Sequence, residues 1–165
     1  MDTGDAIVCA DLQRLYKDWK ARVSGGIPRR DDFDPVDFRY ILGRMSIIEI
    51  RREPRRYFYR LHGTELGGLL GFDLTGKYLD EAPNPHWAAL ARQHNDAVAT
   101  SGIPCVTRRF DQAAGSRQFN VEVLGLPISS DGDTLDMLIT AVTYHKREQW
   151  KPNGEPHSKT MMLQS

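Results

Sequence analysis

The sequence predicts an α+β domain built on an antiparallel sheet, and three observations lead to this fold class. Residues 45–51 and 57–62 are short runs rich in β-branched and aromatic residues, separated by a polar stretch typical of a hairpin loop. Residues 103–110, 119–126 and 135–144 are three longer runs of the same kind, joined by turns that contain glycine. Helical patterns lie before the first group and between the two groups, so strands and helices occupy separate parts of the chain.

The first element is a predicted amphipathic helix over residues 6–23. Its apolar residues recur at the spacing of one helical face, and they are Val8, Leu12, Leu15, Tyr16, Trp19 and Val23. Asp5 is the expected N-cap, and the Gly25-Gly26 pair is expected to end the helix. An apolar stripe of this size must be buried, either on the sheet of its own domain or against a second subunit.

A connector and a short helix come next. Residues 27–34 are polar and bounded by prolines, which indicates a connector. Pro35 suits the first turn of a short helix, because proline has no backbone N–H to lose there. The side chains expected on the buried side of this helix are Phe38, Ile41 and Leu42.

The longest helix is predicted over residues 84–102. Asn84 is the expected N-cap, Pro85 fits the first helical position, and Gly102 ends the helix. The apolar side of this helix carries Trp87, Leu90, Ala91, His94, Ala97 and Val98.

The chain divides into three predicted parts. Residues 1–34 hold the N-terminal helix and connector, residues 35–146 form the core, and residues 147–165 are polar and proline-containing, so they are expected to be a mobile tail. A chain of 165 residues with 40% hydrophobic and 27% charged residues is typical of one globular domain that needs no disulfides.

Charge and composition exclude several classes of function. The 22 basic residues balance the 22 acidic ones, so no net field favours nucleic acid or anionic lipid. No apolar run reaches the roughly 20 residues that span a bilayer, and the N-terminus has no signal-peptide pattern. Cys9 and Cys105 lie far apart and form no metal or redox spacing. A cytoplasmic protein with reduced thiols is expected, without membrane or nucleic-acid partners.

The most informative stretch is residues 57–77, YFYRLHGTELGGLLGFDLTGK. An aromatic strand runs into Gly63-Thr64, a glycine-punctuated apolar turn follows, and the stretch ends on Leu74-Thr75-Gly76-Lys77. This stretch resembles the opening of a PAS domain. The chain is also similar, over about residues 6–146, to a divergent bacterial family of stand-alone PAS domains. The elements that carry this narrower resemblance are Trp19, Pro28-Arg29, Phe33-Asp34-Pro35 and Tyr59-Arg60-Leu61-His62-Gly63-Thr64.

The resemblance implies a PAS-like five-stranded antiparallel sheet with short helices, one longer helix and the added N-terminal helix. It also implies a sensory or interaction module that binds a ligand between the main helix and the inner face of the sheet. The residues expected around this ligand are Tyr59, Arg60, Leu61, Trp87, Leu90, His94, Val121, Val123 and Ile139. The strand residues among them follow from the rule that positions i and i+2 share a face.

Motifs that would indicate catalysis or a cofactor are incomplete. Residues 71–77 match the pattern G-x-x-x-x-G-K of a phosphate-binding loop, but Tyr78 stands where Ser or Thr must reach Mg²⁺. Neither cysteine lies in the Asn-Cys-Arg motif typical of light-sensing flavin domains, and the nucleophile elbow G-x-S-x-G is absent. The histidines form no H-x-H or H-E-x-x-H unit. Neither an enzyme nor a metal site is predicted.

Two residues leave alternatives open. His94 on the longest helix resembles the position from which a histidine ligates haem in oxygen-sensing PAS proteins, although a lone helical histidine is more often a half-buried, hydrogen-bonded residue. Arg60 lies inside a strand, where a buried guanidinium would be either a structural ion pair or an anchor for a ligand. Arginine doublets stand at residues 29–30, 51–52, 55–56 and 108–109, and the cluster over residues 51–56, which superficially resembles a nucleic-acid patch, is interpreted as a solvated hairpin turn.

The sequence therefore predicts a non-catalytic sensory PAS module that binds a small ligand, a protein partner or both. No cofactor is assigned. The alternatives are a metabolite-binding enzyme or carrier on a PAS-like fold, and a haem-binding sensor. A stand-alone sensor must act through contact, so a signalling protein partner and a homodimer are expected. The expected dimer interface is formed by Leu12, Leu15, Tyr16 and Trp19.

Overall fold

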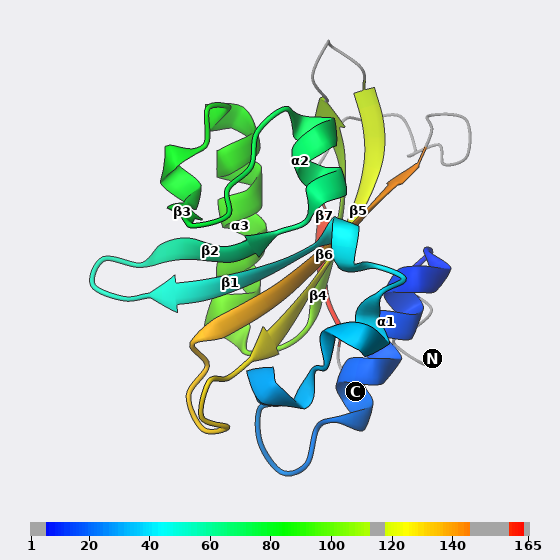
Figure 1. The fold of residues 1–165 in the computed structure, drawn as a ribbon, viewed down its shortest axis with the longest axis vertical. Coiled ribbons are helices and arrows are strands. Elements are labelled where there is room, and N and C mark those ends of the chain that lie inside the picture. The colour runs from blue at the N-terminus through cyan, green and yellow to red at the C-terminus, as the bar shows by residue number, and fades with distance from the viewer. Residues whose placement is uncertain (1–5, 113–117, 146–158, 164–165) are drawn as a thin grey trace.

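The core of the protein is a seven-stranded antiparallel sheet with helices on both faces (Figure 1). The computed structural model describes residues 6–112, 118–145 and 159–163. The strands stand in the order β3-β2-β1-β6-β5-β4-β7. Their bounds are β1 Met45–Arg51, β2 Arg56–His62, β3 Lys77–Tyr78, β4 Cys105–Gln112, β5 Gln118–Ile128, β6 Met137–His145 and β7 Lys159–Met162.

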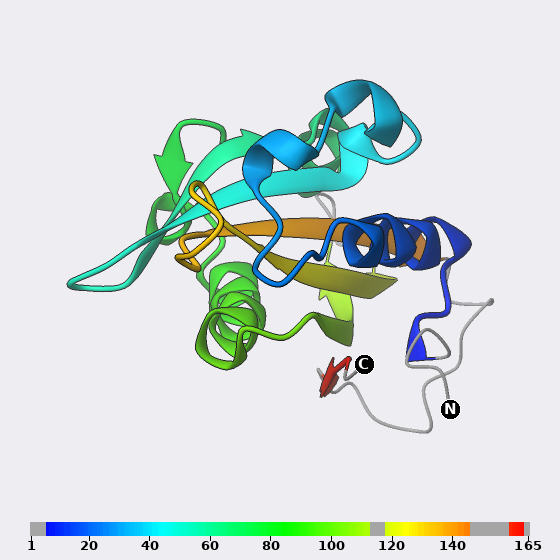
Figure 2. The same cartoon turned by 90° about the horizontal axis from the view of Figure 1, so that it is seen from below.

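Within the described residues, three α-helices and several 3₁₀ turns complete the fold. Helix α1 and helix α3 lie on opposite faces of the sheet, as Figure 2 shows, and α2 lies on the same face as α3. The helices are α1 Ala10–Ala21, α2 Thr64–Leu70 and α3 Pro85–Ser101, with 3₁₀ turns at Arg30–Asp32, Pro35–Phe38, Leu42–Arg44 and Leu79–Glu81.

The predicted α+β class is confirmed, and each of the five predicted runs forms a strand. Two strands were not expected. The two-residue strand β3 pairs with β2, and β7 pairs with the outer edge of β4. Residues 159–163 lie in the predicted mobile tail, so that part of the prediction is wrong. Residues 146–158 and 164–165 lie outside the described residues.

Helix α3 begins and ends where its sequence predicts. The Asn84 side chain accepts a hydrogen bond from the Trp87 backbone N–H at 3.0 Å, and Pro85 occupies the first turn. Gly102 takes a left-handed conformation with φ of 67°, which glycine adopts without steric cost, and ends the helix. The short helix at Pro35–Phe38 is also present, with Phe38 buried.

Helix α1 is shorter than the predicted span of residues 6–23. The backbone N–H groups of Val8 and Cys9 donate to the Glu122 carboxylate on β5, at 3.0 and 2.8 Å, so the chain begins its helix only after Cys9. Val8 is consequently 56% exposed instead of lying on the apolar stripe. The expected N-cap, Asp5, lies outside the described residues. At the other end α1 stops at Ala21, four residues before the first glycine that was expected to stop it.

The apolar stripe of α1 packs on the sheet of its own domain. Leu12, Leu15 and Tyr16 are buried in one cluster with β5 and β6 residues such as Leu124 and Ile139. Trp19 is partly buried there, and its indole Nε1–H donates to the Pro127 carbonyl at 2.9 Å. The assignment of Leu12, Leu15 and Tyr16 to a dimer interface is therefore corrected, because they fill the core between α1 and the sheet. For Trp19, which stays partly exposed, the assignment remains a prediction.

A one-residue bulge in β2 changes which side chains face α3. Ile47 of β1 pairs with Leu61, whereas the next residue, Ile48, pairs with Tyr59, so Arg60 is an extra residue in β2. As a result Tyr59 and Leu61 face opposite sides of the sheet, Tyr59 toward α3 and Leu61 toward α1. The rule that positions i and i+2 share a face fails across this bulge.

The Glu122 carboxylate is expected to be the main anchor of the N-terminal segment. It is buried, and besides the two backbone N–H groups it accepts a hydrogen bond from Arg108 Nε at 3.1 Å. Glu122→Gln removes the negative charge. Its amide N–H₂ group, which is a donor, would then compete with the backbone N–H groups of Val8 and Cys9, which are also donors. We expect it to lower the free energy of unfolding by about 2–3 kcal/mol, as measured by urea denaturation.

The control is Glu65→Gln, because Glu65 is exposed and lies 3.7 Å from Arg44. An exposed pair of this kind contributes at most about 1 kcal/mol. Equal losses in the two variants would contradict the anchoring role of Glu122.

Candidate functional site

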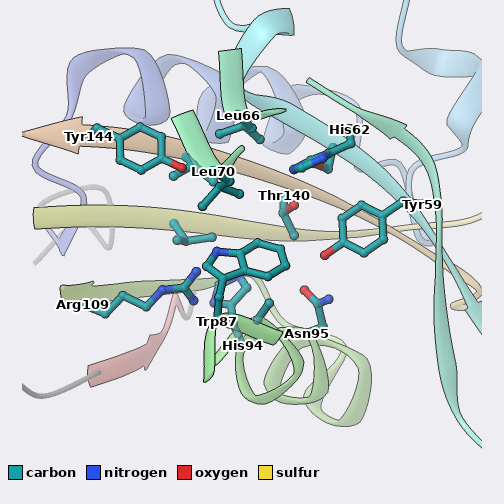
Figure 3. Close-up of a pocket in the computed structure, with 14 residues that line it drawn as sticks. Tyr59, His62, Leu66, Leu70, Trp87, His94, Asn95, Arg109, Thr140 and Tyr144 are labelled. Carbon is teal, nitrogen blue, oxygen red and sulfur yellow. The ribbon is translucent and has the colours of Figure 1, made fainter. Parts of the chain in front are cut away.

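A small cavity lies between the inner face of the sheet and helices α2 and α3 (Figure 3). Its volume, counted as the space open to the centre of a water molecule, is about 30 Å³, which is enough for roughly two waters. The apolar part of its wall is formed by Leu66, Leu70, Trp87, Ala91, Val123 and Val142. The polar part is formed by Ser46, Tyr59, His62, His94, Asn95, Arg109, Thr140 and Tyr144.

Four of the residues predicted around a ligand line this cavity, namely Tyr59, Trp87, His94 and Val123. Val121 packs beside Val123 in the same cluster without lining the cavity. Leu61 and Ile139 lie on the opposite face of the sheet with α1, and Leu90 is half-buried away from the cavity. These three positions are corrections, and for Leu61 the reason is the bulge at Arg60.

Arg60 is also misplaced by the sequence prediction. Its side chain is 61% exposed and forms an ion pair with Glu49, which Arg51 contacts as well at 2.6 Å. The guanidinium is therefore on the surface, on the face opposite the cavity, and it cannot anchor a ligand there. An ion pair with this exposure contributes little to stability.

The structure adds polar residues that sequence reasoning did not select. His62 reaches the cavity because the bulge returns it to the same face as Tyr59. Arg109 and Thr140 lie on strands that are buried on both faces. The sequence of these strands therefore shows no alternation of apolar and polar residues that could mark the positions facing the cavity. Asn95 follows His94 on α3. A polar residue on the buried face of this helix was the one sequence signal that could have marked it as a cavity residue.

His94 is held by a chain of hydrogen bonds that leads away from the cavity. Its ring Nδ1 lies 2.6 Å from Thr107 Oγ1 on β4, which in turn lies 2.7 Å from Thr160 Oγ1 on β7. The other ring nitrogen, Nε2, has no hydrogen-bond partner among the described residues. Burial, together with the positive charge of Arg109, lowers the pKa of His94 to about 3, so the ring is neutral.

His62 is neutral as well. The backbone N–H of Leu74 donates to His62 Nδ1 at 3.0 Å, so Nδ1 is an acceptor and the ring proton sits on Nε2. Burial lowers the pKa of His62, while the Asp73 carboxylate acts in the opposite direction. Burial also raises the pKa of Tyr59 to about 12, which keeps its hydroxyl protonated. All three groups are thus uncharged at neutral pH.

The geometry around His94 does not fit haem ligation. A Cβ atom placed on Gly125 would lie 2.5 Å from His94 Nε2, so the strand backbone already occupies the direction in which an iron atom would bind. A cavity of about 30 Å³ is also far smaller than a porphyrin. Within the described ranges, no group of three or more His, Cys, Asp or Glu side chains could hold a metal ion.

The arginine-rich hairpin between β1 and β2 is engaged with acidic groups. Arg56 forms a two-pronged pair with Asp80, with both nitrogen–oxygen distances at 2.8 Å, and Arg55 lies 3.7 Å from Asp96. The Arg52 guanidinium donates to the Leu135 carbonyl. These contacts agree with the interpretation of residues 51–56 as a solvated loop.

No helix in the described part of the chain is long and apolar enough to cross a membrane.

Gly125 allows the close approach of α3 to the sheet. Gly125→Ala would place its Cβ 2.5 Å from His94 Nε2 and 2.7 Å from Val98 Cγ2. His94 cannot yield without breaking its contact with Thr107. We expect a loss of about 1–3 kcal/mol in the free energy of unfolding. The matched control is Gly68→Ala on α2, where a Cβ meets nothing within 4 Å and alanine favours the helix. An unchanged stability for Gly125→Ala would contradict this packing.

The buried neutral state of His94 predicts a dependence of stability on pH. Because its pKa falls from 6.5 in the unfolded chain to about 3 in the folded one, its contribution is complete above pH 6.5 and is lost as the pH decreases toward 3. The slope for one such residue is about 1.4 kcal/mol per pH unit. We expect His94→Gln to show a shallower decline between pH 6.5 and 4.5 in urea unfolding. Parallel curves for the two proteins would show that His94 is not buried in the neutral form.

Comparisons with known proteins identify the fold. A family model described as a PAS domain matches residues 9–143, which confirms the resemblance seen in the sequence. Among curated proteins, no significant match was found. The solved structure of the VqmA dimer of Vibrio cholerae in the absence of target DNA is 14% identical, with a TM-score of 0.50, over 62% of this chain and 47% of that chain.

Two further solved structures are similar. VqmA from Vibrio cholera in complex with ligand and DNA is 16% identical with a TM-score of 0.49, over 60% of this chain and 45% of that chain. A LOV protein of Rhodobacter sphaeroides is 11% identical with a TM-score of 0.45, over 81% of this chain and 69% of that chain. The chain spans about half the length of the VqmA chains. At these identities the likeness concerns the fold alone.

Proposed function

The chain belongs to the PAS domain family, and on this premise we propose that it is a non-catalytic sensory module that binds a small ligand between α3 and the sheet. The observation that carries the proposal is the cavity itself, in which polar side chains of α3 and the sheet, among them Tyr59, Asn95 and Thr140, meet an apolar wall. Asn95 is 2% exposed, and its Nδ2 makes no hydrogen bond of good geometry among the described residues, with Tyr59 as its polar neighbour. A buried polar group without a well-formed hydrogen bond costs about 1–3 kcal/mol, and a bound ligand can remove that cost.

A chain of hydrogen bonds connects His94, which lines the cavity, with the edge strand of the sheet. The hydrogen bonds from His94 through Thr107 to Thr160 join helix α3 to the outermost strand, β7. An edge strand carries backbone N–H and C=O groups that can pair with another chain. We therefore include in the proposal that ligand binding is passed through this chain of hydrogen bonds to β7, where a signalling partner or a second copy of the protein makes contact.

Filling the cavity should abolish ligand retention. Ala91 lines the cavity from α3, and Ala91→Leu adds three carbon atoms to this space. Ala89 lies on the exposed side of the same helix, so Ala89→Leu is the matched control. In native mass spectrometry of protein purified from cells, we expect a bound small molecule on the wild type and on Ala89→Leu, and none on Ala91→Leu.

The same samples distinguish a sensor from an enzyme or carrier. A sensor returns the released molecule chemically unchanged after incubation with the protein, whereas an enzyme converts it. Equal retention by Ala91→Leu and the wild type would contradict the proposed site, and conversion of the released molecule would contradict the non-catalytic role.

A further inference from the structure

His62 joins the cavity to the loop over residues 71–76, which connects α2 with β3. It is the last residue of β2, and its ring lines the cavity together with Leu70, the last residue of α2 (Figure 3). Its ring centroid lies 6.3 Å from that of Phe72 in the loop and 6.4 Å from that of Trp87 on α3. Only 1% of the side chain is exposed, so the ring is enclosed between β2, the loop and α3.

The ring nitrogen Nδ1 holds this loop at the end of β2. The buried backbone N–H of Leu74 donates to His62 Nδ1 at 3.0 Å. Two further hydrogen bonds join the loop to β2: the His62 backbone N–H donates to Thr75 Oγ1 at 3.1 Å, and the Gly76 N–H donates to the Tyr59 carbonyl at 2.8 Å. Of these three contacts, only the one at Nδ1 depends on the protonation state of a side chain.

A carboxylate stands close to the same nitrogen. Asp73 Oδ1 lies 3.7 Å from His62 Nδ1, beyond hydrogen-bonding distance, and accepts the backbone N–H of Thr75 at 2.9 Å. A protonated imidazole has N–H donors on both nitrogens and no acceptor. Protonation of His62 would therefore leave the Leu74 N–H facing another donor. The same proton would give the ring a charge-assisted partner in Asp73.

The charges around His62 favour the neutral ring at pH 7. Besides Asp73, the titratable or charged side chains on the elements packed around it are Tyr59 on β2, Lys77 on β3, His94 on α3, Arg109 on β4 and Tyr144 on β6. Burial raises the pKa of Tyr59 to about 12 and lowers that of His94 to about 3, so both are uncharged. Burial also lowers the pKa of His62 from its ordinary value of 6.5, and Asp73 acts against this shift. Because a carboxylate supports the charged form of His62, it is the first of the two cavity histidines to take up a proton as the pH falls.

From this geometry we infer that His62 is a proton-operated latch on the cavity. With a neutral ring, Nδ1 holds Leu74, and the loop keeps the end of α2 in place. A proton taken up from solvent by Nδ1 breaks this hydrogen bond and draws the ring toward Asp73, which releases the loop. Leu70 lies directly before the loop and lines the cavity, so the release opens the wall at this point. This inference rests on the proposed function, since it names how access to the same cavity is regulated.

The latch is tested without a ligand, by NMR on the intact chain from about pH 7.5 to about pH 5. The ring nitrogen signals of His62 report its protonation. Hydrogen exchange reports opening at the amides of Leu74 and of Gly71, which donates to the Gly67 carbonyl at the end of α2. We expect the protection of both amides, relative to that of the fully buried Ile48 in β1, to fall at least about tenfold as the ring titrates, because a buried N–H loses its acceptor. The ratio to Ile48 removes the effects of pH on exchange chemistry and on global unfolding.

Two variants separate a titrating latch from a merely structural histidine. Asp73→Asn keeps the oxygen that accepts from Thr75 but removes the charge that favours a protonated ring. We therefore expect the titration of His62 and the loss of Leu74 protection to move together to lower pH. In His62→Asn, Oδ1 takes the place of Nδ1 and stays an acceptor, so Leu74 protection is expected to change less than about twofold over the same range. The control is His86→Asn, which removes an exposed histidine and should leave the wild-type transition unchanged.

Constant Leu74 protection through the titration of His62, or a transition that stays at the same pH in Asp73→Asn, would overturn the inference. A ring that stays neutral down to about pH 5 would overturn it as well. If Leu74 is released while Gly71 stays protected, His62 holds the loop but does not regulate the cavity. If His62→Asn does not fold, the wild type and Asp73→Asn decide the question.

These outcomes are independent of the proposed ligand site. A latch that fails leaves the cavity as a binding site, because the ligand test compares the wild type with Ala91→Leu at one pH. The proposed function fails only if those two proteins retain the same ligand in native mass spectrometry.

Discussion

The contact between His94 and Gly125 sets how closely helix α3 approaches the sheet, and the cavity depends on it. Only a hydrogen atom fits between the Gly125 Cα and the imidazole, because a Cβ would lie 2.5 Å from Nε2. On its other side, the same ring contacts Thr107 Oγ1 at 2.6 Å. The two contacts together fix the distance of α3 from the sheet and the rotation of α3 about its own axis. Trp87 and Asn95 are placed over the inner strands by this one anchored residue, and the space that they enclose is the cavity.

The opposite face of the sheet is closed by a different interaction. The Glu122 carboxylate binds the backbone at Val8 and Cys9 and turns the chain into α1, whose Leu12 and Leu15 complete the core there. Adjacent positions on β5 thus have separate roles, since Glu122 holds the outer helix while Val123 lines the cavity. The outer face is closed mainly by apolar side chains, with the buried Glu122 and Thr143 contacting the segment before α1, whereas the polar residues of the inner face surround the cavity.

The sequence predicts much of the fold because most elements have strong local signals. The strand over residues 45–51 and the helix from Pro85 to Ser101 coincide with their predictions, and for the helix the reason is a capping asparagine and a terminal glycine. β7 was missed because a four-residue edge strand, KTMM, has almost no period of its own and forms only by pairing with β4.

The cavity was predicted less completely, and the causes are physical. The inner and outer positions of β6 are all buried, so nothing in the run MLITAV shows that Thr140 faces α3 and Ile139 faces α1. The bulge at Arg60 follows from how β1 and β2 pair, which is a non-local property. Arg109 stands in an arginine doublet that is divided between the two faces, with Arg108 contacting Glu122 and Arg109 at the cavity.

The most direct test of a ligand site under α3 is a high-resolution crystal structure of the protein as purified from cells. The account predicts non-protein electron density in the cavity, within hydrogen-bonding distance of Asn95. A cavity that holds only water, or one that has closed so that Asn95 Nδ2 bonds to other protein atoms, would contradict it.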